Sequence, residues 1–312
     1  FFKQKTAYEI PKRDWSSDVC SSDLYVHRCC KEVDRALGRF LPSASTKPAT
    51  IHQAMRYSLF AGGKRMRPAL VMAAAEACGG SWQEAMPLAC AVECIHTYSL
   101  IHDDLPAMDN DDFRRGKPTN HKVYGEGVAV LAGDALLTQA FEIVAQARGW
   151  GRYSHQDLVL ELARASGSLQ LIAGQVADLE GEGKRLPLSE LRYIHERKTS
   201  ALLCCSVRFG GMSANCTPAQ LRGLTEFGYN VGLAFQIIDD ILDVTQSSET
   251  LGKTAGKDTA AQKATYPSLL GLDASKLEAA RLTDRAFKAL KVFRGRATAL
   301  EALARYLLQR DR

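Results

Sequence analysis

Apolar residues recur three or four positions apart along most of the chain, as in amphipathic helices, and the alternation typical of strands is almost absent. Loops and turns rich in polar residues, glycine or proline are predicted at 42–50, 181–187, 215–218 and 247–265. No repeat or linker divides the pattern, so we predict a single all-α domain. The expected helices are 33–41, 51–59, 69–78, 89–101, 128–147, 158–179 (interrupted by glycines 167 and 174), 191–209, 227–244, 277–293 and 298–309.

The first 24 residues differ from the rest of the chain. Positions 15–24 are polar and serine-rich, without helical apolar spacing. Such a segment is either a non-native leader, similar to translated sequencing-adapter read-through, or a native disordered one. We therefore place the domain at 25–312 and expect that deletion of 1–24 leaves folding and activity intact.

Length and composition exclude several classes of function. The chain has 312 residues, 46% of them hydrophobic, which is enough for a substantial core. A net charge of +5 is too small to indicate nucleic-acid binding, and no apolar run is long enough to predict a membrane span. The nine cysteines are odd in number and lack paired zinc-ligand spacing, which predicts reduced thiols in a cytoplasmic protein.

The segment 102–116 concentrates acidic residues and ends in two arginines, Arg114 and Arg115. So many carboxylates repel one another unless water or cations neutralise them, and oxygen ligands of this kind favour magnesium. Magnesium commonly shares its remaining positions with substrate phosphates, and arginine binds phosphate oxygens in pairs. The segment therefore predicts a diphosphate site rather than a solvated acidic loop. Its carboxylates are Asp103, Asp104, Asp109, Asp111 and Asp112.

A second acidic group lies in the predicted helix 227–244. Asp239 and Asp243 are four residues apart and therefore share a helix face, with Gln236 on the same stripe. Like charges on an apolar helix are unfavourable without a compensating cation. In the first group, Pro106 indicates a loosened helix end that would bring Asp103 and Asp109 together.

Basic and polar residues at four other places complete the candidate site. Two cations follow a flexible glycine pair, and a histidine precedes the first acidic group by two helical turns. A lysine and threonine pair interrupts an apolar helix, and lysines also occur in the long loop 247–265. Taken singly, each has an ordinary structural explanation as a turn, core or surface residue. These residues are Gly62, Gly63, Lys64, Arg67, His96, Lys198, Thr199, Lys253, Lys257 and Lys263.

In order and spacing, these motifs resemble the trans-isoprenyl diphosphate synthases, in particular the bacterial-type farnesyl diphosphate synthases. The resemblance covers nearly all of 25–312 and implies a helical isoprenoid synthase fold with a central cavity between the two acidic motifs. The matching residues are Gly62 to Pro68, Asp103 to Asp109 with Arg114 to Gly116, Gly133-Asp134, Gly174-Gln175, Lys198-Thr199, Phe235-Gln236 and Asp239 to Asp243.

The resemblance also implies a cytoplasmic homodimer and a role for each site residue. Three magnesium ions would be held, with substrate bound, by Asp103, Asp109, Asp239 and Asp243. The allylic diphosphate would contact Arg114, Lys198, Thr199, Gln236 and Lys253. Isopentenyl diphosphate would bind Lys64, Arg67, His96 and Arg115.

The same resemblance identifies Tyr98 and Ser99 as the residues that set product length. They lie about 6 to 8 Å down the helix from Asp103, and a bulky Tyr98 favours farnesyl over geranylgeranyl diphosphate. The chain departs from the family at Gln170-Leu171, where Gly-Met is common, which could alter packing beside the cavity.

Four other functions share part of this pattern. A geranylgeranyl diphosphate synthase differs only in product. A catalytically silent regulatory subunit of a prenyl synthase would normally have lost an acidic or basic motif, and this chain keeps them all. A terpene cyclase should carry an Asn/Ser/Glu metal motif in place of 239–243. A calcium loop beginning at Asp109 fails because Arg114 and Asn120 replace its required glycine and glutamate.

Overall fold

A computed structural model gives the structure over residues 15–148, 151–245 and 264–308, with side chains from Asp23 onward. Helices dominate these ranges, which confirms the all-α prediction. One antiparallel hairpin joins β1 (Phe113–Arg114) and β2 (Lys117–Pro118). The helices are α1 (Trp15–Phe40), α2 (Ala49–Leu59), α3 (Met66–Ala77), α4 (Trp82–Asp103), α5 (Asn120–Tyr124), α6 (Glu126–Gln146), α7 (His155–Ser166), α8 (Leu171–Gly181), α9 (Leu188–His195), the π-helix η1 (Glu196–Ser200), α10 (Ala201–Ser213), α11 (Pro218–Thr245), α14 (Tyr266–Leu270), α15 (Leu272–Ala289), the 3₁₀-helix η2 (Leu290–Phe293) and α16 (Thr298–Leu308).

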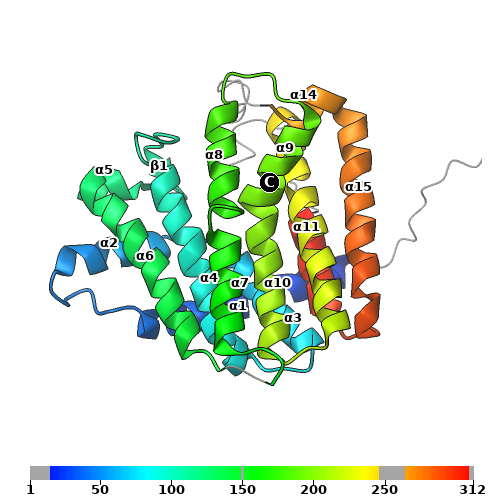
Figure 1. The fold of residues 1–312 in the computed structure, drawn as a ribbon, viewed down its shortest axis with the longest axis horizontal. Helices are drawn as coiled ribbons and strands as arrows, with labels where there is room; N and C mark the ends of the chain where they lie inside the picture. Colours follow the sequence, from blue (N-terminus) through cyan, green and yellow to red (C-terminus); the bar gives the residue numbers. More distant parts are fainter. Residues whose placement is uncertain (1–14, 149–150, 246–263, 309–312) are drawn as a thin grey trace, which may run out of the picture.

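Long helices run side by side through the molecule, and α3 and α10 form its centre (Figure 1). Most of α3 is buried, and its many alanines let α4 and α10 pack closely against it. Gly210 of α10 shows how close the approach is, because a Cβ there would lie 2.1 Å from the carbonyl oxygen of Val71. Small residues therefore determine the packing distances of the core.

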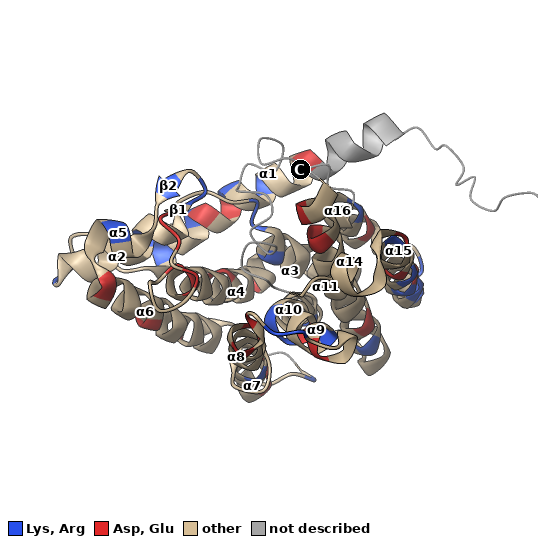
Figure 2. Ribbon diagram, turned by 90° about the horizontal axis from the view of Figure 1, so that it is seen from above, with Lys and Arg blue, Asp and Glu red and all other residues tan. Residues whose placement is uncertain are grey.

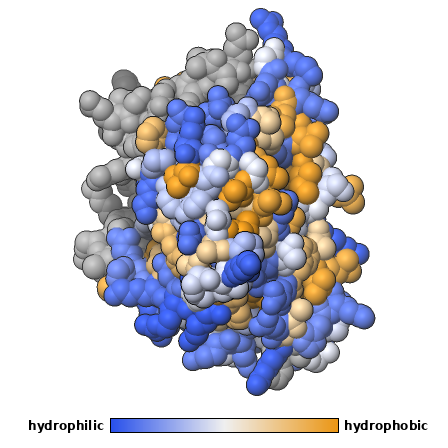
Figure 3. All heavy atoms as spheres, turned by 90° about the vertical axis from the view of Figure 1, so that its left-hand side faces the viewer, coloured by the Kyte–Doolittle hydropathy of each residue, from blue (hydrophilic) through white to orange (hydrophobic). Residues whose placement is uncertain are grey.

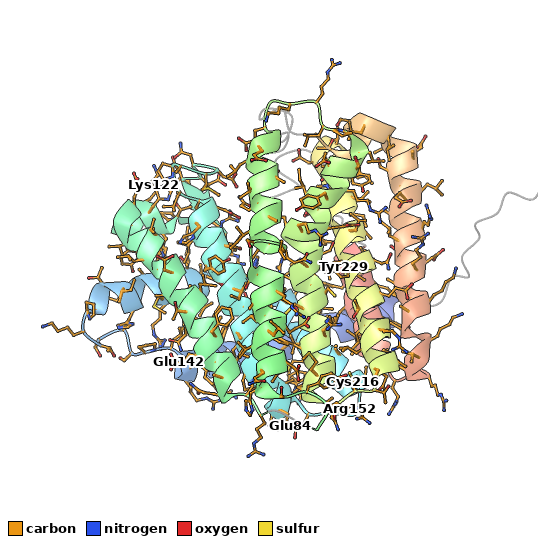
Figure 4. The ribbon with its side chains drawn as sticks, viewed as in Figure 1. Glu84, Lys122, Glu142, Arg152, Cys216 and Tyr229 are labelled. Carbon is orange, nitrogen blue, oxygen red and sulfur yellow. The ribbon has the colours of Figure 1, made fainter. Side chains whose placement is uncertain are left out.

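Both acidic motifs lie towards the same end of the bundle, at the top of Figure 1, where α4 and α11 end. The opposite end is closed by hydrogen bonds between two turns, near the labelled Arg152 and Cys216 (Figure 4). The backbone N–H of Arg152 donates to Oδ1 of Asn215 at 3.1 Å, and the Tyr153 hydroxyl donates to the carbonyl of Cys216 at 3.0 Å. The candidate site is thus built at one end of a bundle that is tied together at the other.

Two predicted helices are divided in the structure. The stretch 158–179 is two helices, because the chain breaks at Gly167 and restarts at Leu171, whereas Gly174 lies within α8. A Cβ at Gly174 would lie 2.2 Å from the backbone nitrogen of Lys198, so this glycine serves helix packing rather than helix termination. The stretch 191–209 is divided by the π-helix η1, and the short β-hairpin was not predicted.

At the N-terminal end, the first helix begins well before the predicted range 33–41 and includes residues 15–24, where no helical spacing was found. Helix α1 begins at Trp15, within the leader set aside at 1–24, and residues 1–14 lie outside the described ranges. Extending an existing helix is cheap, since each added residue gains a hydrogen bond without a new nucleus. The domain boundary at Tyr25 stays a prediction. Helix α16 ends at Leu308, so Gln309, the predicted last helical residue, lies outside the described residues.

Candidate active site

The first acidic motif turns back on itself where α4 ends. Asp103 is the last residue of α4, and the backbone N–H of Asp109 donates to the carbonyl oxygen of Asp103 at 2.8 Å. Pro106 lies in this turn, where it cannot continue the helix. The turn therefore brings two carboxylates six residues apart to one place, as the sequence predicts.

Asp104 has a different role from its neighbours, because it is buried and faces Arg114. The guanidinium Nε of Arg114 donates to both oxygens of Asp104, at 2.8 and 3.0 Å. Burial raises the pKa of Asp104, and Arg114 partly offsets that shift. Arg114, predicted as a contact of the allylic diphosphate, is thus anchored on the acidic motif itself and holds the β1 strand against it. The outer Asp112 pairs with Lys122 at 2.7 Å on the surface.

The electrostatic environment of Asp103 suits a carboxylate that awaits a cation. Burial raises its pKa to about 6, with a further contribution from Asp109, while Lys198 and Arg114 act in the opposite direction. The influence of Lys198 is informative, because this residue comes from η1, far along the chain. The first acidic motif and the lysine and threonine pair therefore lie on opposite sides of one site. Figure 2 looks down on this end of the bundle, with the acidic segment beyond α4 on one side and α9 to α11 on another.

Asp239 and Asp243 lie one turn apart on α11, both partly exposed. Across 15–148, 151–245 and 264–308, no three Asp, Glu, His or Cys side chains form a complete metal site. Magnesium, however, readily takes its remaining ligands from water and diphosphate. Carboxylate pairs from two motifs, one of which includes Asp103 with its raised pKa, fit ions that bind together with substrate.

Lys198 and Thr199 are held on the π-helical turn η1. The Nζ of Lys198 lies 2.6 Å from Oδ2 of Asp178 on α8, and the Thr199 hydroxyl donates to Oε1 of Gln236 at 3.0 Å. Single π-turns within α-helices are frequent at functional sites, because they redirect side chains locally. The turn also needs a small neighbour, since a Cβ at Gly232 would lie 2.6 Å from the Cα of Ser200.

A cavity of about 230 Å³ joins the two motifs. Asp109 contributes to it from the first acidic motif, while Gln236 and Asp240 contribute from α11. Lys198, Thr199 and Asp178 line the same cavity, together with apolar side chains from α9. The predicted metal ligand Asp109 therefore shares one cavity with three of the predicted allylic-diphosphate contacts, Lys198, Thr199 and Gln236, whereas Arg114 does not line it.

A second basic cluster surrounds His96. Burial, together with Arg67 and Arg115, holds the pKa of His96 well below its ordinary value, so the ring is neutral near pH 7. Burial and the nearby Arg115 also lower the pKa of Arg67 to about 10, and its buried Nε has no hydrogen-bond partner. Two guanidiniums close together, one of them with an unused buried donor, form a site for an anion such as diphosphate.

The glycine pair shapes this cluster. Arg115 donates from Nη1 to the carbonyl of Gly62, and a Cβ at Gly63 would lie 2.7 Å from the Arg115 guanidinium carbon. Both glycines adopt positive φ angles, which disfavour other residues. Lys64 lies at the rim, with its Nζ 5.0 Å from the centre of the Tyr306 ring. The structure thus brings three of the predicted isopentenyl diphosphate contacts, Arg67, His96 and Arg115, to one region, whereas the Lys64 side chain contacts Tyr306 instead.

Tyr98 is buried on α4, one turn below the first acidic motif. Its ring meets that of His102 edge to face, with 5.7 Å between centroids. His102 is in turn held against α6, where its Nε2 lies 3.0 Å from the carbonyl oxygen of Val130. A Cβ at Gly133 would lie 2.1 Å from that nitrogen, so Gly133 makes room for the His102 ring. The hydroxyl of Ser99, by contrast, donates to the carbonyl of His96 at 3.0 Å.

Some predicted site residues lie outside the described ranges, and some residues of the site were not predicted. Lys253, Lys257 and Lys263 lie outside the described residues. Gln170, where the resemblance leads us to expect glycine, accepts a hydrogen bond from Nη1 of Arg197 at 2.9 Å. Sequence reasoning missed Asp178, whose partner lies 20 residues away on another helix. Its position three residues after the Gly174-Gln175 motif was the one available signal.

Comparison with known proteins agrees with this geometry. Residues 48–295 match the family model described as Polyprenyl synthetase. The chain is 52% identical to a chloroplastic geranylgeranyl pyrophosphate synthase of Capsicum annuum, over 92% of this chain and 78% of that protein. It is 48% identical to a farnesyl diphosphate synthase of Geobacillus stearothermophilus, over 82% of this chain and 86% of that protein.

Solved structures give the same result. A geranylgeranyl pyrophosphate synthetase from Pyrococcus horikoshii superposes with a TM-score of 0.86 at 30% identity, covering 96% of this chain and 100% of that one. A putative farnesyl-diphosphate synthase from Marinomonas superposes with a TM-score of 0.77 at 39% identity, covering 92% and 98%. The chain belongs to the polyprenyl synthetase family, the trans-isoprenyl diphosphate synthases.

Proposed function

We propose that the protein condenses isopentenyl diphosphate first with dimethylallyl diphosphate and then with geranyl diphosphate, forming farnesyl diphosphate. The observation that carries this proposal is that two acidic motifs lie at one end of the bundle beside two cationic clusters. One cluster is Lys198 with Arg114, and the other is Arg67 with Arg115. Lys198 faces Asp103 across the site, and Arg67 with Arg115 forms a second anion site nearby. Two diphosphate substrates need two such sites.

In the proposed reaction, the allylic carbon–oxygen bond breaks and leaves a carbocation and diphosphate. The double bond of isopentenyl diphosphate attacks the cation, and loss of a proton restores the alkene. Lys198 and Thr199 orient the leaving diphosphate, and Arg67, His96 and Arg115 orient the second substrate. Magnesium held by Asp103, Asp109, Asp239 and Asp243 would neutralise charge on the leaving group.

Product length is the finer part of the proposal. A buried Tyr98, braced by His102, supports a short cavity and a fifteen-carbon product. The competing proposal, a geranylgeranyl diphosphate synthase, is favoured by the 52% identity to such an enzyme. A non-catalytic regulatory subunit is a weaker proposal, because both acidic motifs and both cationic clusters are present.

We also propose a homodimer. Exposed apolar side chains gather on α6 and α8, including Val130, Leu131, Ile172 and Val176. Figure 3 looks onto the α5 and α6 side of the molecule and shows patches of apolar side chains, mainly on the right of this view, among hydrophilic ones. Exposed apolar patches larger than those of an ordinary monomer surface mark protein interfaces. A second copy of the chain is the partner we propose there.

Among the described residues, α6 is the one helix long and apolar enough to cross a membrane by length and composition. Core helices of globular proteins pass the same test, and α6 packs along α4. The eight cysteines whose side chains are described, all from residue 23 onward, are free thiols, which supports a reducing compartment such as the cytoplasm. Nucleic acid is not among the partners we propose, since the cationic clusters are small and suit diphosphates.

The test is turnover of the purified protein with magnesium and labelled isopentenyl and dimethylallyl diphosphates. We expect magnesium-dependent formation of a prenyl diphosphate, lost on chelation and restored by added magnesium. Failure to form any product with either dimethylallyl or geranyl diphosphate would contradict the proposed activity and favour the regulatory subunit.

A further inference from the structure

Asp240, the middle carboxylate of the second acidic motif, is buried, unlike Asp239 and Asp243. Its Oδ2 accepts hydrogen bonds from Nε2 of His195 at 3.1 Å and from the backbone N–H of Tyr266 at 3.0 Å. Its Oδ1 lies 3.5 Å from Nε2 of Gln236. The carboxylate therefore already has donors on both oxygens, all of them from protein.

These donors come from the elements that surround the cationic turn. His195 is the last residue of α9 and directly precedes η1, the turn that carries Lys198 and Thr199. Gln236, which contacts Asp240, also accepts the hydroxyl hydrogen bond of Thr199. The hydrogen bonds thus close a ring that starts at His195, crosses α11 and returns to the same turn at Thr199.

The fourth element in this ring is the start of α14. The backbone of Tyr266 binds Asp240, and its ring stacks on the His195 ring with 5.7 Å between centroids and 18° between planes. Asp240 consequently ties together α9, α11 and α14. Buried carboxylates are costly unless hydrogen-bonded, so each donor matters to the geometry of the whole ring.

We propose that Asp240 is a positioning residue rather than a magnesium ligand, and that with His195 it holds the π-helical turn so that Lys198 and Thr199 face the allylic diphosphate. The proposal rests on the proposed function, because it assigns these two residues to the allylic substrate. It divides the second acidic motif into partly exposed carboxylates at 239 and 243 and a buried, hydrogen-bonded one at 240.

Two pairs of variants test this division. Asp240→Asn is compared with Asp239→Asn, and His195→Phe with His195→Gln. Phenylalanine keeps a ring beside Tyr266 but removes the donor, whereas glutamine retains a donor near the position of Nε2. Steady-state assays give the KM for each substrate, kcat and the magnesium concentration at half-maximal rate, and circular dichroism checks folding.

We expect Asp240→Asn and His195→Phe each to raise the KM for dimethylallyl diphosphate about tenfold, because each removes one buried hydrogen bond that orients the turn. The KM for isopentenyl diphosphate and the magnesium concentration at half-maximal rate (the magnesium midpoint) should stay within about twofold of wild type, because the groups that bind them do not share this hydrogen bond. His195→Gln should recover most of the loss, and Asp239→Asn should instead raise the magnesium midpoint.

A magnesium midpoint raised in Asp240→Asn as much as in Asp239→Asn would overturn the proposal, as would an unchanged allylic KM in His195→Phe. If Asp240→Asn does not fold, the His195 pair decides the question by itself. Wild-type protein in the same assay separates the two claims. Inactive wild type contradicts the proposed function, whereas active wild type with unaltered variants contradicts this inference alone.

Discussion

The Oδ2 of Asp178 and the Nζ of Lys198 lie 2.6 Å apart, joining α8 to the π-helical turn across the cavity. Lys198 also influences Asp103 from this position. The lysine is therefore already pointed at the site before a substrate binds. Geometry of this kind reduces the cost of orienting a cation when diphosphate arrives.

Removal of Asp178 should misdirect that lysine. We expect Asp178→Ala to raise the KM for the allylic substrate about tenfold, because the ion pair orients Lys198. The KM for isopentenyl diphosphate should change little, since Arg67 and Arg115 lie in the other cluster. Equal effects on both substrates would contradict the assignment of Lys198 to the allylic site.

The raised pKa of Asp103 predicts a pH dependence for activity. Its value of about 6 in the free protein means that acidification through this range protonates a proposed magnesium ligand. At low magnesium, the rate should therefore fall as pH drops below about 6, and excess magnesium should shift the fall to lower pH because the ion competes with the proton. A profile insensitive to magnesium concentration would count against this role.

The raised pKa of Asp103 also predicts that the stability of the folded protein falls as pH rises, whereas activity rises with pH. The folded-state pKa of Asp103 exceeds its ordinary value of 3.8, so stability falls as pH rises from about 4 to 6. Asp103→Asn should therefore stabilise the metal-free protein at pH 8 by on the order of 1 kcal/mol. Turnover in this variant should drop by at least about a hundredfold. The surface variant Asp112→Asn is the control and should alter neither quantity; unfolding midpoints and rates measure both.

Two neighbouring arginines should respond differently to substitution. Arg65 is buried in an ion pair with Glu93 at 2.8 Å and also contacts Asp34, so its role is structural. Arg65→Met should cost about 3 to 5 kcal/mol, because it leaves Glu93 buried without its partner. Denaturant unfolding measures this loss.

Arg67→Met should instead raise the KM for isopentenyl diphosphate more than about tenfold while changing stability little, since the Arg67 Nε has no partner to lose. The reverse pattern, with Arg67→Met unstable and Arg65→Met kinetically impaired, would invalidate the assignment of the second diphosphate site.

Product length should depend on the contact between Tyr98 and His102. Tyr98→Ala should lengthen the product, because it removes a buried ring below the first acidic motif. Gly133→Ala should also alter the product distribution, since the new Cβ would lie 2.1 Å from Nε2 of His102 and must displace its ring. Mass spectrometry of the products, with Gly127→Ala as a control on the same helix, checks both. Gly127 has no neighbour within 4 Å of an added Cβ. Unchanged products in Tyr98→Ala would show that Tyr98 is not the floor of the cavity.

Helical class, order of the long helices and the turn at Pro106 could be predicted from sequence, because periodicity and proline act locally. The motif residues were also accessible, since their charge and spacing stand out at Asp103, Asp109, Asp239 and Asp243. What sequence could not provide were partners distant along the chain. Asp178 and Lys198, Arg65 and Glu93, and Asp240 and His195 meet only through helix packing.

The roles of glycines also depend on contacts between distant helices, which the sequence does not reveal. Gly174 lies inside α8, where local reasoning predicts a break, and its use becomes clear only beside the backbone of Lys198. The π-turn at η1 likewise has no local sequence signal. Such features depend on how closely two helices approach, and periodicity does not report that distance.

The most direct test of the account is the product that wild-type protein makes from isopentenyl diphosphate with the five-, ten- and fifteen-carbon allylic primers in turn. We predict that the first two primers give farnesyl diphosphate and that the fifteen-carbon primer is not extended. Extension of farnesyl to geranylgeranyl diphosphate at a comparable rate would contradict the proposed product and the role of Tyr98.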